Sequence, residues 1–242
     1  FKGEVDRFIY SRYANPTVVM FEKRLALMEG ATYGMAFASG MAAMFGSLGS
    51  LVKAGDRVVA SRALFGSCLY VIQDLLTKYG VETVLVDGTD LSQWEQALSK
   101  PVTAVFLETP SNPCLDIIDV RAVADLTHKA GGRLIVDNVF ATPVLQKPLQ
   151  LGADIVMYST TKHIDGQGRC LGGIVLGTED FIRGEFDPYM KHTGAAISPF
   201  NAWVMLKGME TLELRCRAQT TSAALVADAL AAHPRVKKVI YP

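Results

Sequence analysis

Short apolar runs rich in branched residues alternate along the chain with longer stretches in which apolar and polar positions are mixed. Glycine and polar residues bound the short runs, which is typical of buried strands. The runs predict strands at residues 35–38, 57–60, 83–86, 104–107, 134–136, 155–158 and 173–176. Because these strands are apolar on both faces, we expect a mostly parallel sheet covered by helices on both sides.

The intervening stretches have the apolar spacing of helices. They predict helices at residues 16–28, 41–52, 67–79, 91–98, 120–129 and 144–149. The pattern after residue 200 is helical to about residue 232. We therefore expect an α/β domain over residues 16–200 and a helical connector over residues 201–242. Ligands of such sheets bind beyond the carboxyl ends of the strands.

Composition narrows the function classes. The 242 residues include 24 basic and 24 acidic side chains, which argues against a nucleic-acid or membrane-surface binder. No apolar run is long enough to span a membrane. The four cysteines form no CxxC pair and the four histidines have no metal-ligand spacing. We expect reduced thiols, a cytoplasmic location and no metal.

The two ends of the chain suggest that it is part of a longer polypeptide. It begins at Phe1 rather than at methionine, and it ends in the strand-like sequence Val239-Ile240-Tyr241-Pro242. We expect a further C-terminal domain to follow the helical connector.

A lysine, Lys162, follows the predicted strand at 155–158 within four residues, behind the hydroxyls of Ser159 and Thr161. Most lysines are simply solvated. If this one is buried beside the strand, its pKa falls, and a neutral amine can form a Schiff base with a carbonyl. The two hydroxyls would then be placed to bind phosphate oxygens.

Other polar groups follow predicted strands in the same way. Ser39-Gly40-Met41 opens a helix, where backbone N–H groups can hold an anion, although a tight turn would look similar. Asp137 ends an apolar strand and would need a positive partner if buried, or would otherwise cap a helix or turn. Glu108 also follows a core strand, where a structural hydrogen bond is the ordinary explanation.

Taken together, these groups match the requirements of pyridoxal 5'-phosphate. This cofactor needs an anion cradle, an amine for its aldehyde, a carboxylate for its ring nitrogen and a flat side chain over its ring. The amine would be Lys162 and the carboxylate Asp137. Phe65 would supply the flat side chain, although it could equally be an ordinary core residue. The cradle would consist of Gly40, Met41, Ser159 and Thr161.

The segment 154–168, DIVMYSTTKHIDGQG, resembles the cofactor-attachment signature of the Cys/Met-metabolism pyridoxal-phosphate enzymes. The resemblance implies the large domain of a fold-type I pyridoxal-phosphate enzyme, with the small C-terminal domain missing. It also implies that Lys162 binds the cofactor and moves protons between substrate carbons, and that Asn112 lies near the cofactor ring. Four further blocks match that family in order: YSRYANPT at 10–17, SGMAA at 39–43, ETPSNP at 108–113 and VDN at 136–138.

The resemblance further implies shared active sites. Tyr10 and Arg12, in the N-terminal segment 1–15, would reach the phosphate held by a neighbouring subunit, within a homotetramer built from two dimers. The chain departs from many relatives at Phe65, where tyrosine is common, and at Ser67, where methionine γ-lyases have cysteine. His163 replaces a common aromatic residue after the lysine.

The blocks around Phe65 and Lys162 look most like those of O-succinylhomoserine sulfhydrylases. This likeness implies γ-replacement, in which O-succinylhomoserine and sulfide give homocysteine and succinate in methionine biosynthesis. Cystathionine γ-synthase and O-acetylhomoserine sulfhydrylase are the nearest alternatives. A methionine γ-lyase and a non-catalytic cofactor-binding subunit also remain open. A nucleotide-binding domain is disfavoured because GxGxxG and GxxxxGK[ST] are absent.

Overall fold

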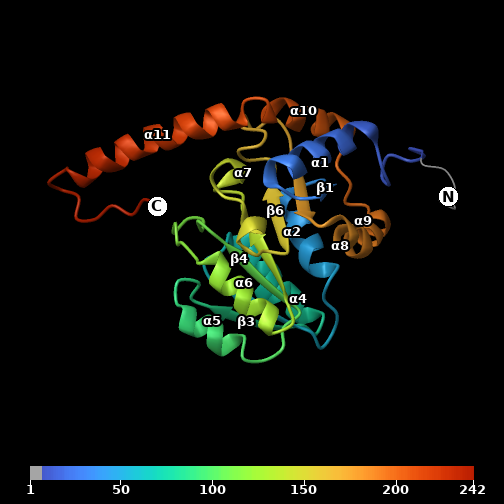
Figure 1. The fold of residues 1–242 in the computed structure, drawn as a ribbon, viewed down its shortest axis with the longest axis horizontal. Coiled ribbons are helices and arrows are strands. Elements are labelled where there is room, and N and C mark those ends of the chain that lie inside the picture. Colours follow the sequence, from blue (N-terminus) through green and yellow to red (C-terminus); the bar gives the residue numbers. More distant parts are fainter. Residues whose placement is uncertain (1–6) are drawn as a thin grey trace.

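A computed structural model describes residues 7–242, which form a seven-stranded sheet between two helical layers (Figure 1). The strands are β1 (Tyr33–Phe37), β2 (Arg57–Ser61), β3 (Glu82–Val86), β4 (Ala104–Glu108), β5 (Arg133–Asp137), β6 (Ile155–Ser159) and β7 (Gly173–Gly177). Their order in space is β1-β7-β6-β5-β4-β2-β3. Among these seven strands, only β7 runs against its neighbours, β1 and β6, so the predicted mostly parallel sheet is confirmed.

Helices follow nearly every strand. They are α1 (Pro16–Glu29), α2 (Gly40–Gly49), α3 (Gly66–Tyr70), the π-helical η1 (Val71–Leu75), α4 (Leu76–Lys78), α5 (Leu91–Ala97), α6 (Val120–Lys129), α7 (Thr142–Leu145), the 3-10 helix η2 (Pro148–Leu151), α8 (Glu179–Phe181), the π-helical η3 (Ile182–Phe186), α9 (Asp187–Thr193), α10 (Pro199–Met209) and α11 (Leu212–Ala231). The helical pattern predicted after residue 200 corresponds to α10 and α11.

Two helix predictions need correction, and one helical stretch was missed. The helix predicted at 144–149 is wrong in its extent, because α7 ends at Leu145 and Gln146 is extended, with φ −141° and ψ 139°. Pro148 then begins η2, and the α conformation is unfavourable for the residue that precedes a proline. The helix predicted at 67–79 is interrupted by η1. The helices between residues 179 and 193 were not predicted, because Gly184 and Pro188 suggest breaks that the structure accommodates.

Alternate residues of each strand face different helical layers, which explains why the strands are apolar throughout. In β4, Val105 and Leu107 belong to the core beneath α1, α5, α6 and α10. Ala104 and Phe106 belong to the core beneath α2, α4 and α9. Burial on both faces leaves polar side chains only at the strand ends, and this is where the candidate site lies.

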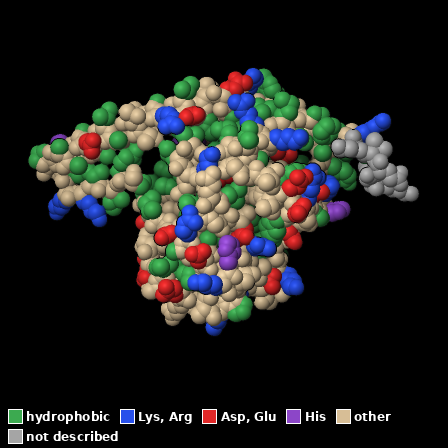
Figure 2. Space-filling view, viewed as in Figure 1, with side chains coloured by type: hydrophobic (Ala, Val, Ile, Leu, Met, Phe, Trp, Pro, Cys, Tyr) green, Lys and Arg blue, Asp and Glu red, His purple; other side chains and the backbone are tan. Residues whose placement is uncertain are grey.

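The last helix, α11, extends away from the sheet as an arm (Figure 1). Its first two turns are anchored by the buried residues Leu212 and Cys216, whereas Leu225, Val226 and Leu230 are exposed. Figure 2 shows hydrophobic side chains gathered along this arm. Between residues 7 and 242 there is no helix that combines the length and the apolar character needed to cross a membrane.

The carboxylate of Glu29, at the end of α1, is buried and hydrogen-bonded to β6, the strand that leads into the candidate site. Glu29 is fully buried and accepts a hydrogen bond from the hydroxyl of Tyr158 in β6. The Asn138 amide donates to the same hydroxyl at 2.7 Å. Burial raises the pKa of Glu29 from 4.5 to about 7. These hydrogen bonds hold together the end of α1, strand β6 and Asn138, the residue that follows Asp137.

Glu29→Gln is expected to flatten the dependence of stability on pH. Because the pKa of Glu29 is raised in the folded state, its stabilising contribution is complete below about pH 4.5 and is lost as pH rises through about 7. The amide stays neutral at every pH. Between pH 4.5 and pH 8 we therefore expect the free energy of unfolding to fall by about 3 kcal/mol less in the variant than in the parent. Urea unfolding at several pH values measures this, and parallel curves for the two proteins would contradict it.

Candidate functional site

The carboxyl ends of β1, β4, β5 and β6 lie at one edge of the sheet, because these strands are all parallel to one another. A cavity of about 240 Å³ opens there. Eight of the ten site residues predicted from the sequence line it and are therefore brought together. The full lining is Ser39, Gly40, Met41, Met44, Phe65, Cys68, Glu108, Asn112, Asp137, Val139, Met157, Ser159, Thr161, Lys162 and Leu171.

One wall of the cavity is formed by the start of α2 against the end of β6. Ser39 caps the helix by accepting a hydrogen bond from the Ala42 N–H at 3.1 Å. A Cβ atom on Gly40 would lie only 2.4 Å from Cβ of Ser159 and 2.8 Å from its Cα. Only glycine allows this close approach, which brings the start of α2 to the edge of the cavity. The N-terminus of a helix can bind an anion.

The hydroxyl of Thr161 lies on the other side of this edge. It accepts a hydrogen bond from the Gly172 N–H at 3.2 Å and donates to the Gly172 carbonyl at 3.3 Å. Gly172 lies directly before β7. The sequence did not predict this contact between Thr161 and Gly172. Thr161 therefore joins the lysine loop to the start of β7 as well as lining the cavity.

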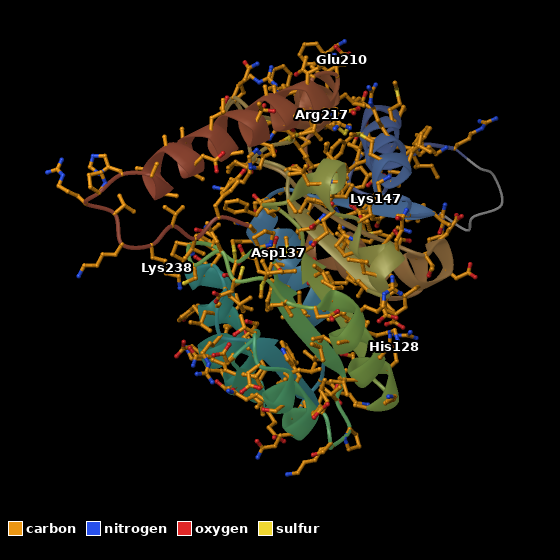
Figure 3. All side chains as sticks on the ribbon, turned by 60° about the vertical axis from the view of Figure 1, so that its left-hand side comes forward. His128, Asp137, Lys147, Glu210, Arg217 and Lys238 are labelled. Carbon is orange, nitrogen blue, oxygen red and sulfur yellow. The ribbon has the colours of Figure 1, made fainter. Side chains whose placement is uncertain are left out.

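Asp137 is a buried carboxylate without a cationic partner in the described part of the chain. The residue is only 6% exposed, and no lysine, arginine or histidine among residues 7–242 forms a salt bridge with it. Figure 3 shows Asp137 in the interior of the molecule. Burial, reinforced by the negative charge of Glu108, raises its pKa from 3.8 to about 8. A positively charged group in the cavity would remove this penalty, as the protonated ring nitrogen of pyridoxal phosphate would.

Glu108 is the direct neighbour of Asp137 across the sheet, since the two residues are in register on β4 and β5. Its carboxylate accepts hydrogen bonds from the Phe65 N–H at 2.8 Å and from the Asn112 N–H at 3.1 Å. The structural hydrogen bond considered for Glu108 is thus present. It ties together the two loops that carry Phe65 and Asn112, and burial raises the pKa of Glu108 itself.

The burial of Lys162 that the preceding strand suggested is not found in the structure. The buried strand β6 ends at Ser159, and the chain then turns outward, so that Lys162 lines the cavity but is itself exposed. Phe65 is 45% exposed and Asn112 is exposed as well. The carboxylates of Asp137 and Glu108 are therefore buried at the bottom of the cavity, whereas Lys162 and Phe65 lie at its mouth.

Several apolar lining residues were not predicted from the sequence. Met44, Met157 and Cys68 are buried beneath the cavity, and Leu171 lies at its rim. Cys68 stands three residues after Phe65 in the first turn of α3, and this helical spacing is the signal that could have placed it in the site. Burial raises the pKa of the Cys68 thiol, which makes it an inert wall rather than a nucleophile.

Tyr10 and Arg12 are not among the residues that line the cavity. The Arg12 guanidinium lies over the rings of Tyr10 and Tyr13, at 5.2 and 4.9 Å from their centres, and donates to the carbonyl of Lys191. Tyr10 is half exposed. Residues 1–6 of the predicted N-terminal segment lie outside the described residues. Within residues 7–242 no group of three histidine, cysteine or acidic side chains could hold a metal ion.

Comparison with known proteins adds independent evidence. The chain is 57% identical over 242 residues to an O-succinylhomoserine sulfhydrylase of Mycobacterium tuberculosis (strain ATCC 25618 / H37Rv). It is 40% identical over 244 residues to an L-methionine gamma-lyase of Porphyromonas gingivalis (strain ATCC BAA-308 / W83). Both of these matches cover the whole of this chain. The fold matches the crystal structure of metB from Corynebacterium glutamicum, with a TM-score of 0.94 and 37% identity over 98% of this chain.

These matches cover only part of each relative. The chain spans 60% of the M. tuberculosis protein, 61% of the P. gingivalis protein and 62% of the chain in the crystal structure. The family model described as Cys/Met metabolism PLP-dependent enzyme matches residues 1–242. The strand-end cavity, with its buried carboxylate and its glycine-walled edge, has the features that this cofactor requires. The chain belongs to the Cys/Met metabolism family of pyridoxal-phosphate-dependent enzymes.

Proposed function

We propose that this chain is the cofactor-binding part of an enzyme that catalyses γ-replacement on an O-acylated homoserine. The proposed reaction joins O-succinylhomoserine and sulfide to give homocysteine and succinate, a step in methionine biosynthesis. The observation that carries the proposal is the cavity that combines the Lys162 amine, the buried Asp137 carboxylate and the Gly40 edge. The choice of ester is supported by relatives of 57% and 43% identity that are named O-succinylhomoserine sulfhydrylases.

The residues of the cavity would each hold one part of the cofactor. Asp137 would pair with the ring nitrogen, and Phe65 would cover the ring, with Asn112 beside it. When bound, the cofactor supplies an aldehyde that links to amines and a protonated ring that accepts electrons from the substrate. The phosphate would be held by the start of α2 and by two hydroxyls, at Gly40, Met41, Ser159 and Thr161.

Lys162 would carry the proton transfers. Its amine would hold the cofactor until the amino-acid substrate binds. The freed amine would then remove the proton from the α-carbon and return protons in the later steps. The exposed position of Lys162 suits this role, because a side chain at the mouth of the cavity can swing between neighbouring substrate carbons.

We also propose that the active site is shared between two subunits of a homotetramer. Tyr10 and Arg12 would contribute to the phosphate site of a neighbouring subunit. The position of both residues outside the cavity of their own chain, with Tyr10 half exposed, supports this arrangement.

The function is tested with the protein as encoded by its gene, supplied with O-succinylhomoserine and equal concentrations of sulfide and cysteine. We expect homocysteine as the main product by mass spectrometry. Mostly cystathionine would instead identify a cystathionine γ-synthase. A parallel reaction with methionine alone distinguishes a lyase, because relatives at 40% and 39% identity are named L-methionine gamma-lyases. Cofactor binding with no product from any of these mixtures would overturn the proposal.

A further inference from the structure

The loop that carries Lys162 packs directly against the junction of α10 and α11. A Cβ atom on Gly208, near the end of α10, would lie 2.2 Å from the carbonyl oxygen of Ile164 and 3.0 Å from that of Asp165. Backbone therefore meets backbone at this point, without intervening side chains. Contacts of this kind fix the distance between the lysine loop and the helical junction.

A single arginine of α11 fastens the two parts together. The Arg215 guanidinium donates from Nη1 to the carbonyl of His163 at 2.8 Å and from Nη2 to the carbonyl of Gly208 at 2.8 Å. Its Nε donates to the Thr211 hydroxyl at 3.0 Å. All three nitrogens are used, and the planar fork holds two carbonyls from different segments in one fixed geometry.

The lysine loop is shaped to receive this guanidinium. Gly166 has a φ of +75°, a backbone conformation that favours glycine, and a Cβ atom there would lie 2.2 Å from Nη1 of Arg215 and displace the guanidinium. The Gly166 N–H donates to the carbonyl of Lys162 at 2.7 Å. Lys162 is thus held through its own carbonyl by Gly166 and through the next carbonyl by Arg215.

The rest of the loop has its own support, which is independent of α11. Asp165 is buried and accepts hydrogen bonds from the Arg169 N–H at 2.7 Å and from Arg169 Nε at 2.8 Å. The Lys162 N–H donates to the carbonyl of Ser159 at 3.3 Å. Loss of Arg215 should therefore shift the loop without unfolding it.

We propose that Arg215 is a positioning residue for Lys162, acting through the carbonyl of His163, so that α11 sets where the lysine amine stands at the cavity mouth. The inference rests on the proposed role of Lys162 but not on the identity of the substrate. Arg215 lies outside the cavity, and its hydrogen bonds go to neither the cradle residues nor Asp137. Its removal should affect the linkage to the lysine and leave the rest of the cofactor site intact.

Two ligands separate these effects in the protein as encoded by its gene. Pyridoxal phosphate links to the lysine, whereas pyridoxamine phosphate has the same ring and phosphate but no aldehyde. For Arg215→Ala we expect roughly a 10-fold or greater loss of affinity for pyridoxal phosphate and less than about a 3-fold change for pyridoxamine phosphate, because only the first ligand depends on the lysine.

The matched control is Arg217→Ala. It removes an exposed arginine of the same helix, which Figure 3 labels. The side chain of Arg217 pairs with Glu213. We expect this control to bind both ligands as the parent does. Arg215→Lys is expected to recover only part of the lost affinity, since one ammonium cannot hold both carbonyls in the same plane.

Two results would overturn the inference. A loss of affinity for both ligands in Arg215→Ala would assign Arg215 a general structural role. Binding indistinguishable from that of Arg217→Ala would show that the contact to the His163 carbonyl does not position the lysine. If the parent protein binds pyridoxal phosphate without any linkage that borohydride traps, the proposed role of Lys162 fails, and the inference fails with it.

Discussion

Lys162→Ala is expected to lower turnover of the amino-acid substrate by roughly 1,000-fold or more, the largest effect we expect from any single substitution in the chain. The lysine amine is proposed both to hold the cofactor and to carry the proton transfers, so its loss removes two contributions together. The remaining cavity keeps the cradle at Gly40 and the carboxylate of Asp137. The variant should therefore still bind the cofactor, but in a form that borohydride does not attach to the protein.

Lys162→Arg separates charge from amine chemistry. Arginine keeps the positive charge at the cavity mouth but stays protonated and cannot supply a free amine. It should be as inactive as the alanine variant if the proposal is right. Lys53→Ala removes an exposed lysine that does not line the cavity and is the matched control, with turnover expected to equal that of the parent. Near-normal turnover in either Lys162 variant would contradict the proposed role.

The sheet could be predicted from the sequence because its strands are buried on both faces. Each of the seven predicted apolar runs overlaps an observed strand. The direction of β7 could not be read in the same way, because residues 173–176 are as apolar as the parallel strands. Strand β7 is antiparallel because the lysine loop, which joins β6 to β7, ends at the same edge of the sheet at which β6 ends. The pairing of Ser159 with Gly173 records that return.

The site could be predicted in part because its residues follow strands that share one direction. Gly40, Asp137 and Ser159 come at or after the ends of different strands, and parallel packing brings them to one edge. Residues that act through the backbone gave no such signal. Arg215 is one of many polar residues on a long helix, and its spacing does not reveal that it reaches the His163 carbonyl 52 residues earlier in the chain.

The exposure of Lys162 could not be predicted for a related reason. The apolar pattern identifies the strand before the lysine, but it does not show how sharply the chain turns after Ser159. The loop places Asp165 in the interior and Lys162 outside, the reverse of what their neighbours suggest. Burial alone would raise the pKa of the Asp165 carboxyl group, but hydrogen bonds and charge from Arg169 outweigh it and lower that pKa. The contacts with Arg169 therefore satisfy the buried Asp165 carboxylate.

Asp137→Asn is expected to have opposite effects on stability and on activity. In the cofactor-free protein the buried carboxyl group has a pKa of about 8, against an ordinary value of 3.8. Its stabilising contribution is therefore complete below about pH 4 and is lost as pH rises through about 8. Asparagine has nearly the same shape, can still accept the hydrogen bond that the Val139 N–H makes at 3.0 Å, and carries no charge to desolvate.

The stability difference is measured by urea unfolding of the cofactor-free proteins at pH 5 and pH 8.5. Between pH 5 and pH 8.5 the free energy of unfolding should fall by roughly 4 kcal/mol more in the parent than in the Asp137→Asn variant. The reason is that the pKa of Asp137 lies about three units above pH 5, and each unit corresponds to about 1.4 kcal/mol. Asp125→Asn, which replaces an exposed aspartate of α6, is the control and should follow the parent at both pH values.

Activity should change in the other direction. The protonated ring nitrogen needs an anionic partner in a buried site, and the amide cannot provide it, so we expect Asp137→Asn to lower turnover roughly 100-fold or more. Asp137→Glu keeps the charge but adds a methylene group against Glu108 and should retain more activity than the amide. The combination of greater stability at high pH with lower turnover would identify Asp137 as a carboxylate kept for the cofactor at a cost in stability. Turnover equal to that of the parent, or stability that falls with pH as steeply as in the parent, would show that its burial has another cause.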